Sequence, residues 1–272
     1  MAKKPTLKKA VSPSGGTAFF DPPARVKFRH PLAYEKAAVV EWIKYPGDLS
    51  GKVDGVEVTY QYILFDLDGT LTDPGAGIIN SVLYALRRYG IEGDPHFLRR
   101  FVGPPLINSF MEFYGFTEEQ AREAVEFYRE YYRERGIFEN RLYPGIPELL
   151  ATLTERGKQL ALATSKPTVF ARQVLTHFQL HHYFAEEMIV GSYLDGRRTN
   201  KAEVIAAVLA LLPPEREKAV MVGDRKYDVE GARANGIAAI GVTYGYGEVA
   251  ELERARPAQI AHSVPELLNF LL

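Results

Sequence analysis

The chain has 272 residues, of which 46% are hydrophobic and 25% charged, an ordinary composition for a folded globular protein. Its net charge of −1 provides no overall field that would attract nucleic acid or an anionic membrane surface. The absence of cysteine excludes disulfides, thiolate chemistry and cysteine zinc sites. No apolar run approaches the roughly 18 residues of a membrane span, and no apolar segment follows the N-terminal lysines, so we expect a cytoplasmic protein.

Residues 1 to about 37 differ in composition from the rest of the chain. Residues 1–37 place lysines and arginines among prolines and glycines, so the segment buries little. We interpret it as a solvated leader; the alternative is a basic arm for an acidic partner. Residues 38–45 and 56–60 are expected to form two short strands around a turn. The prediction for 1–58 is a partly disordered N-terminal extension that could hold a short hairpin.

A buried strand is predicted at residues 62–65, where an apolar run ends abruptly in charge. Asp66 and Asp68 follow at a spacing of two, and Gly69 and Thr70 then open a turn. Ligands of open α/β sheets bind at such carboxyl ends of strands. One acid could be an ionised nucleophile that attacks phosphorus while its neighbour carries a proton, and Mg²⁺ would suit these oxygen ligands. The alternative is a polar turn after a core strand.

Residues 75–142 are predicted to be an all-helical insert. Apolar residues recur at helical spacing from Ile78 until Gly90, and Thr117 to Gln120 form a capping box that opens a second helix. The segment 101–106 between them is too rich in proline and glycine to be a helix interior. We interpret the aromatic stripe of the second helix as packing rather than as a cofactor site.

From Tyr143 onward helices and strands alternate, which predicts a parallel sheet with helices on both faces. Strands are expected at 160–163, 188–190, 219–222 and 238–242. Helices are expected at 147–157, 169–178, 202–212 and 229–234, with a further one from 248 and a closing one at 264–272.

Two of these strands also end in polar groups. The strand at 160–163 leads into Thr164, Ser165 and Lys166, where a hydroxyl and backbone N–H groups could hold a phosphate, although such a sequence is also a common helix start. The strand at 219–222 leads to Asp224 and Asp228, at a spacing of four. This pairing after a buried strand favours a site, although Asp228 could merely cap the next helix.

Lys201 is expected at the start of a helix, where a cation opposes the helix dipole. A position that is poor for stability favours a functional role. The lysine could neutralise the nucleophile and the transferring phosphoryl group, since it is worth roughly 4 kcal/mol to an anion at close range.

The order of these motifs, Asp-x-Asp-Gly-Thr, then the hydroxyl, the lysine and Gly-Asp-x-x-x-Asp, resembles the haloacid dehalogenase superfamily of phosphohydrolases. The resemblance implies a Rossmann-like parallel-sheet core at 59–74 and 143–272, with an inserted helical cap at 75–142. It implies that Asp66 is the nucleophile, Asp68 the general acid/base, Thr164 a phosphate ligand and Lys201 the charge-balancing group. Asp66, Asp68, Asp224 and Asp228 would bind Mg²⁺, and Gly69, Thr70, Ser165 and Lys166 would bind the phosphate.

Within the superfamily the chain looks most like the phosphoglycolate phosphatase-like branch and its 5′-nucleotidase subset, on residues 101–105, 164–167 and 223–226. The resemblance implies hydrolysis of a small phosphorylated metabolite by a monomer or homodimer. The lysine motif departs from the usual pattern, so Lys166 competes with Lys201. The alternatives are a dehalogenase, a sugar-phosphate mutase, a protein or phosphotyrosine phosphatase, a receiver module, and a binding protein that acts through its basic arm.

Overall fold

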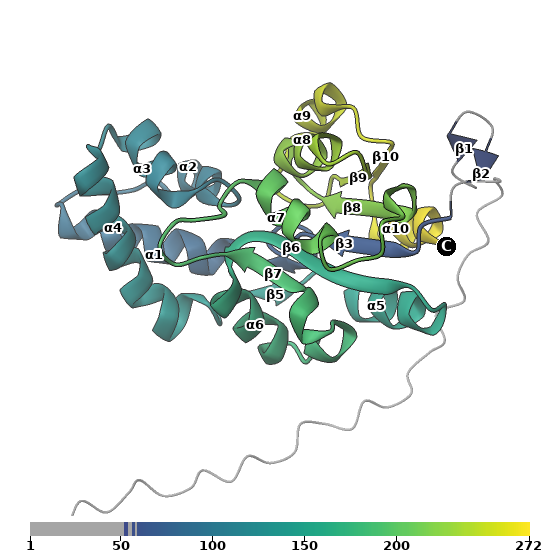
Figure 1. The fold of residues 1–272 in the computed structure, drawn as a ribbon. Helices are drawn as coiled ribbons and strands as arrows, with labels where there is room; N and C mark the ends of the chain where they lie inside the picture. The colour runs from purple at the N-terminus through teal and green to yellow at the C-terminus, as the bar shows by residue number, and fades with distance from the viewer. Residues whose placement is uncertain (1–51, 54–55, 58) are drawn as a thin grey trace, which may run out of the picture. The chain divides into compact units, whose positions relative to one another are not determined.

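The computed structural model describes residues 52–53, 56–57 and 59–272 (Figure 1). All of these residues belong to the second of the chain's two units, residues 48–272. The leader and the strand expected at 38–45 therefore lie outside the described residues. In the second unit, β1 (Lys52–Val53) pairs antiparallel with β2 (Val56–Glu57). The strand expected at 56–60 is thus shorter than predicted, because Thr59 and Tyr60 belong to no strand.

Strand β3 (Tyr62–Phe65) lies at the centre of a six-stranded sheet and is buried along its whole length. The strand order is β10-β9-β8-β3-β6-β7, and every neighbouring pair is parallel. The other strands are β6 (Gln159–Pro167), β7 (Ile189–Ser192), β8 (Ala219–Gly223), β9 (Ala238–Val242) and β10 (Gln259–Ala261). The chain moves outward from β3 to β7 and then returns to β8, on the other side of β3. A crevice is expected at such a reversal, at the carboxyl ends of the strands.

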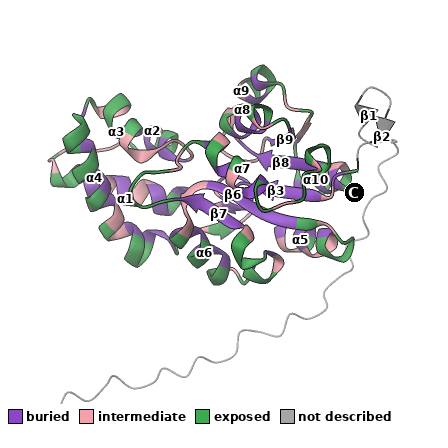
Figure 2. Cartoon of the chain, in the orientation of Figure 1, coloured by how far each residue is buried: buried purple, intermediate pink, exposed green. Residues whose placement is uncertain are grey.

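Successive residues of β3 face opposite sides of the sheet, and each side has its own hydrophobic core. Ile63 and Phe65 pack with one cluster, which includes residues of α5 (Ile146–Glu155), α6 (Thr168–His177) and α10 (Val264–Leu271). Leu64 packs with the other, which includes residues of α7 (Lys201–Leu209), α8 (Lys226–Ala234) and α9 (Val249–Ala255). Figure 2 shows the buried strands between these exposed helix surfaces. The predicted three-layer α/β fold is confirmed.

The segment 75–142 is mostly helical and lies beyond the carboxyl ends of the strands (Figure 1). It contains α1 (Gly75–Arg88), α2 (Pro95–Leu98), η1 (Arg99–Phe101), α3 (Leu106–Tyr114), α4 (Glu118–Tyr131) and a π turn, η2 (Tyr132–Gly136). The capping box is present, since Gln120 N–H donates to Thr117 Oγ1 (3.2 Å) and Thr117 N–H donates to Gln120 Oε1 (3.0 Å). A short antiparallel pair that we did not predict, β4 (Thr72–Asp73) with β5 (Arg141–Leu142), joins the two connections to the sheet.

Several expected boundaries were wrong. Strand β6 continues to Pro167 instead of ending at residue 163. Its pairing with β7 shifts in register after Ala163. The residues after Ala163 are mostly polar, so the sequence did not indicate a strand there. Helix α6 begins at Thr168, one residue before the expected start, so this boundary was nearly right. The edge strand β10 was missed because it has only three residues. In the described part of the chain, none of the helices has the length and apolar character that crossing a bilayer requires.

Candidate active site

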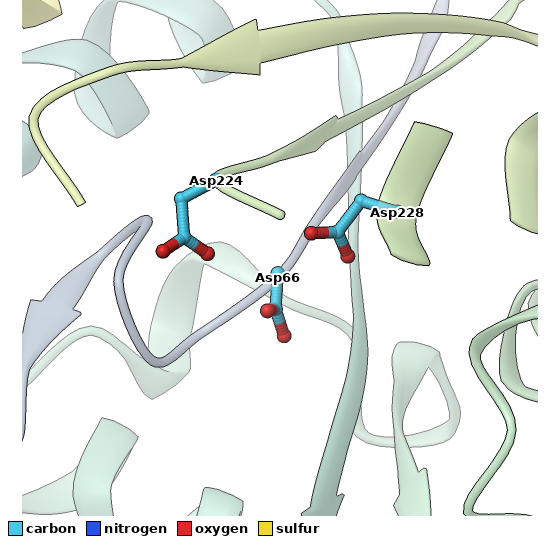
Figure 3. Close-up of side chains that lie close together, drawn as sticks. All are labelled: Asp66, Asp224 and Asp228. Atoms are coloured by element: carbon cyan, nitrogen blue, oxygen red, sulfur yellow. The ribbon is translucent and has the colours of Figure 1, made fainter. Parts of the chain in front are cut away.

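Three buried carboxylates meet at the carboxyl edge of the sheet. Asp66 follows β3, Asp224 follows β8, and Asp228 lies in the first turn of α8. One oxygen from each lies within 4.8 Å of the others, and Figure 3 shows the three side chains converging. The parallel register that aligns Phe65 with Val222 explains why the first two acids are neighbours.

Glycines make room for this approach. Gly69 has φ of +90°, which favours glycine, and a Cβ atom there would overlap the Asp224 carboxylate. A Cβ atom at Gly245 would also overlap Asp224, and one at Gly223 would overlap Asp228. Any side chain at these positions would push the carboxylates apart. The backbone of this edge is therefore shaped around the acidic cluster.

The cluster is short of positive charge, and this fits a bound cation. Asp224 Oδ2 accepts a hydrogen bond from Tyr246 N–H (2.7 Å), but Oδ1 is buried and has no partner among the described residues. Burial, and then the charges of Asp228 and Asp66, hold the pKa of Asp224 well above its usual range. Buried anionic oxygens without partners are costly unless a proton or a metal ion compensates them. Three carboxylates are the hard oxygen ligands that Mg²⁺ prefers.

Lys201 supplies one positive charge to the cluster. Its Nζ lies 2.8 Å from Asp66 Oδ1 and 2.8 Å from Asp228 Oδ1, and it donates a hydrogen bond to Ala163 O (3.1 Å). Neither carboxylate oxygen receives a well-aligned hydrogen bond, so the contacts are chiefly electrostatic. Burial lowers the pKa of Lys201, but the two carboxylates outweigh it and the pKa is raised. The lysine therefore stays charged inside the protein.

Asp228 has two separate contacts. Its Oδ2 accepts a hydrogen bond from Arg225 N–H (3.1 Å) at the start of α8, whereas Oδ1 faces Lys201. Asp228 thus caps helix α8 with Oδ2 and contacts Lys201 of the site with Oδ1. Burial raises the pKa of Asp228 to about 6; Lys201 opposes this rise and the charge of Asp66 adds to it.

Asp68 lies outside the cluster of three carboxylates and has a lysine of its own. Its Oδ2 forms an ion pair with Lys166 Nζ, which also lies 5.1 Å from the centre of the Tyr132 ring. Burial raises the pKa of Asp68, although Lys166 lowers it in part. The two lysines that competed for one role therefore contact different acids: Lys201 faces Asp66, and Lys166 faces Asp68.

The remaining residues expected at the site surround these acids. The buried Thr164 accepts a hydrogen bond at Oγ1 from Lys166 N–H (3.2 Å), and Ser165 Oγ donates to Thr199 O (3.2 Å). Thr70 Oγ1 is buried and has no partner within the described ranges. Gly69 lies directly against the Asp224 carboxylate, which leaves no room for a Cβ atom.

A cavity of about 500 Å³ opens onto Asp66 and Asp68. Helices α3 and α4, the loop 103–105 and strand β6 contribute to its walls, which include Ile78, Phe101, Met111, Val125, Tyr128, Tyr132 and Phe170. Its cations are paired: Arg122 with Glu118 (2.5 Å), Arg129 with Glu126 (2.5 Å) and Lys166 with Asp68. From the sequence we expect loop residues near 103–108 to select the leaving group, and these residues line the cavity. The aromatic and apolar wall residues were missed, because their pattern is that of ordinary helix packing.

A second, more polar hollow of about 520 Å³ reaches Asp66 from the other side of the loop 103–105. Arg225 holds this loop: its Nη1 donates to Val102 O (2.9 Å), and its Nε donates to Glu251 Oε1 (2.9 Å). Arg225 was not among the expected site residues. Its place directly after Asp224 was the available signal.

Comparison with known proteins agrees with this geometry. Residues 63–242 match the family of haloacid dehalogenase-like hydrolases. A 5′-nucleotidase of Pseudomonas aeruginosa is 49% identical over 213 residues, which cover 78% of this chain and 96% of that protein. The tyrosine-protein kinase PtkA of Mycobacterium tuberculosis is 42% identical over 206 residues, which cover 75% of this chain and 69% of that protein.

A solved structure extends the similarity to the fold. The crystal structure of a predicted phosphatase from Clostridium acetobutylicum has a TM-score of 0.74 and 49% sequence identity, and the match covers 77% of this chain and 97% of that one. The family match spans the strands that end in Asp66 and Asp224. The chain therefore belongs to the haloacid dehalogenase-like hydrolases and is a phosphatase of phosphoric monoesters.

Proposed function

We propose that this phosphatase hydrolyses nucleoside 5′-monophosphates with Mg²⁺, through an aspartyl-phosphate on Asp66. The observation that carries the proposal is the cavity of about 500 Å³ above Asp66 and Asp68. Its size is within the range of small-molecule sites, roughly 300–1,000 Å³. Glycolate, a two-carbon leaving group, would fill little of it. Its carboxylate would also meet only wall cations that already have partners among the described residues.

The chain's own residues support a two-step reaction. An oxygen of Asp66 attacks phosphorus and the ester P–O bond breaks, while Asp68 gives a proton to the leaving oxygen. Water then attacks the phosphorus of the aspartyl-phosphate while Asp68 takes a proton from this water. The bond between phosphorus and the Asp66 oxygen breaks, which restores the Asp66 carboxylate and releases inorganic phosphate. The raised pKa of the buried Asp68 suits a proton donor, and the charged Lys201 stabilises the anionic groups around Asp66.

Asp66, Asp224 and Asp228 would hold Mg²⁺. The positive charge of the ion would offset the negative charge of the phosphoryl oxygens. In this proposal residues 75–142 are a cap domain and residues 59–74 with 143–272 are the core. The cap encloses the leaving group and excludes bulk water. Arg225 and Arg129 connect the two parts, through Val102 O (2.9 Å) and Leu194 O (2.7 Å).

A panel of phosphate esters tests the proposal. We expect the purified protein with Mg²⁺ to release phosphate from nucleoside 5′-monophosphates with a kcat/KM at least about tenfold above that for 2-phosphoglycolate, a difference of about 1.4 kcal/mol in transition-state binding. EDTA should abolish the activity and Mg²⁺ should restore it. An equal or greater kcat/KM for 2-phosphoglycolate would contradict the substrate assignment, and activity that persists in EDTA would contradict the metal.

The second candidate is hydrolysis of tyrosyl phosphate in proteins. The hollow of about 520 Å³ offers a second approach to Asp66, and one relative is named a tyrosine-protein kinase. A phosphotyrosine peptide belongs in the same panel. A kcat/KM for this peptide above that for every nucleotide would favour the second candidate.

A further inference from the structure

Tyr132 belongs to the wall of the cavity, and its hydroxyl group has no hydrogen-bond partner in the described part of the chain. The residue is 2% exposed and lines the cavity that opens onto Asp66 and Asp68. Its Oη atom is buried and makes no hydrogen bond to any described residue. Buried hydroxyl groups are nearly always hydrogen-bonded in folded proteins. The exception lies at the place where a substrate would bind.

The ring of Tyr132 is held firmly. It stacks on Tyr128, with ring centres 5.3 Å apart and planes at 15°, and it makes an edge contact with Phe170 at 5.4 Å. Lys166 Nζ lies 5.1 Å from the ring centre. These contacts fix the direction of the hydroxyl group, so it cannot turn to find another partner.

The backbone at Tyr132 also departs from a regular helix. The residue begins the π turn η2, in which Ile137 N–H donates to Tyr132 O (2.9 Å) across five residues. Gly136 in this turn packs against Gly77 of α1, and a Cβ atom on Gly77 would overlap the Gly136 carbonyl. The turn directly follows the end of α4 at Tyr131. The turn therefore places Tyr132 by backbone packing that a larger residue would disrupt.

The hydroxyl group is a hydrogen-bond donor. Burial, and then the charge of Asp68, raise the pKa of Tyr132 well above its usual range, so the phenol stays neutral. Lys166 Nζ forms an ion pair with Asp68 and lies 5.1 Å from the centre of the Tyr132 ring, so Asp68 and Tyr132 flank the same lysine. Both residues line the cavity in which the leaving group would lie.

We propose that Tyr132 donates a hydrogen bond to a second oxygen of the leaving alcohol, such as a ribose oxygen, and so selects phosphate esters of sugars and nucleosides. The inference rests on the proposed function and names a residue that determines specificity. A site built to hydrogen-bond a substrate oxygen discriminates strongly against an analogue without it, because the buried group then stays unpaired.

The Tyr132→Phe variant tests the inference, because it removes the hydroxyl and keeps the ring contacts. With a nucleoside 5′-monophosphate we expect kcat/KM to fall about 10- to 100-fold. With phenyl phosphate, whose leaving group has no second oxygen, we expect a change below about threefold. The melting temperature should not fall, because no hydrogen bond within the protein is lost.

Tyr131→Phe is the matched control. This neighbouring hydroxyl donates to Glu139 Oε1 (2.8 Å), and Tyr131 is not among the residues that line the two cavities at Asp66. Its removal should leave kcat/KM for both substrates unchanged. Equal losses for nucleotide and phenyl phosphate in Tyr132→Phe, or no loss for either, would overturn the inference.

A binding measurement separates this inference from the proposed function. In the Asp66→Asn background, which lacks the nucleophile, calorimetry should show that Tyr132→Phe weakens nucleoside 5′-monophosphate binding about tenfold. A wild-type protein without phosphatase activity would refute the proposed function, while this comparison would still decide the role of Tyr132. Equal affinities, or no nucleotide binding by Asp66→Asn, would refute the inference.

Discussion

The floor and the roof of the substrate cavity are built differently. The floor contains Asp66 and Asp68, which follow strand β3, together with Lys166. Asp66 also belongs to the cluster with Asp224 and Asp228, which glycines and Lys201 hold in place. The roof consists of aromatic and apolar side chains from helices, with the unpaired hydroxyl of Tyr132 among them. A change in the floor displaces several charges at once, whereas a side chain in the roof can change alone. We therefore expect the reaction to depend on the floor and the choice of leaving group to depend on the roof.

The largest expected effect separates the two acids of the first motif. Asp66→Asn should abolish turnover of every phosphate ester, because the covalent route has no nucleophile. Asp68→Asn should lose about 10²- to 10⁴-fold in kcat on alkyl esters and keep measurable activity on activated aryl phosphates, whose leaving groups need no proton. Steady-state kinetics with a nucleotide and with para-nitrophenyl phosphate distinguish the variants. Equal, mild losses in both would mean that the roles of Asp66 and Asp68 are misassigned.

Substitutions of the two lysines that contact the acids should differ in their effect on stability. Lys201→Met leaves Asp66 and Asp228 buried without their shared cation, so we expect the free energy of unfolding to fall by about 3–5 kcal/mol and activity to be lost. Lys166→Met removes the partner of Asp68 and should be the milder of the two, with a loss mainly in activity. Urea unfolding and kcat/KM of both variants provide the measurements. If Lys166→Met were the less stable of the two variants, Lys166 and not Lys201 would be the lysine that contributes more to stability.

The smallest expected effect concerns pH and metal. The pKa of Asp228 is raised to about 6 and that of Asp224 is raised well above its usual range, so the folded metal-free protein holds protons that the unfolded chain releases. The contribution of these groups to stability therefore falls as pH rises between about 4 and 6. Mg²⁺ competes with these protons, so the increase in melting temperature on adding Mg²⁺ should be larger at about pH 7.5 than at about pH 5.

Asp224→Asn is the control for this measurement and should reduce the Mg²⁺-dependent increase at both pH values. The roof variant Tyr132→Phe should retain the increase, because it leaves the carboxylates in place. If the increase in melting temperature were independent of pH, or were unchanged in Asp224→Asn, the acidic cluster would not be the Mg²⁺ site.

The site residues that could be predicted are those whose signal is local. Asp66 and Asp224 each follow a buried apolar run, so their place at the ends of neighbouring parallel strands follows from the alternation of helices and strands. The three-layer fold was predicted for the same reason. The continuation of β6 to Pro167 was not, because polar residues form this part of the strand and a register shift accommodates them.

The roof shows the opposite case. Tyr128 and Tyr132 belong to an aromatic stripe that was correctly interpreted as helix packing, since the two rings stack. The same residues also line the cavity, and periodicity does not distinguish a side chain that only packs from one that also faces a substrate. The π turn that directs Tyr132 depends on the contact between Gly136 and Gly77, which lie far apart in the chain.

The sequence by itself determined the order of elements, the parallel sheet and the acids at the ends of its strands, because hydrophobic runs and the charges after them are properties of short segments. Only the tertiary structure decided which lysine faces which acid, how the roof encloses the cavity and that the roof hydroxyl of Tyr132 has no partner among the described residues. These features depend on distances between segments that are remote in sequence, and such distances are set by the packing of the whole fold.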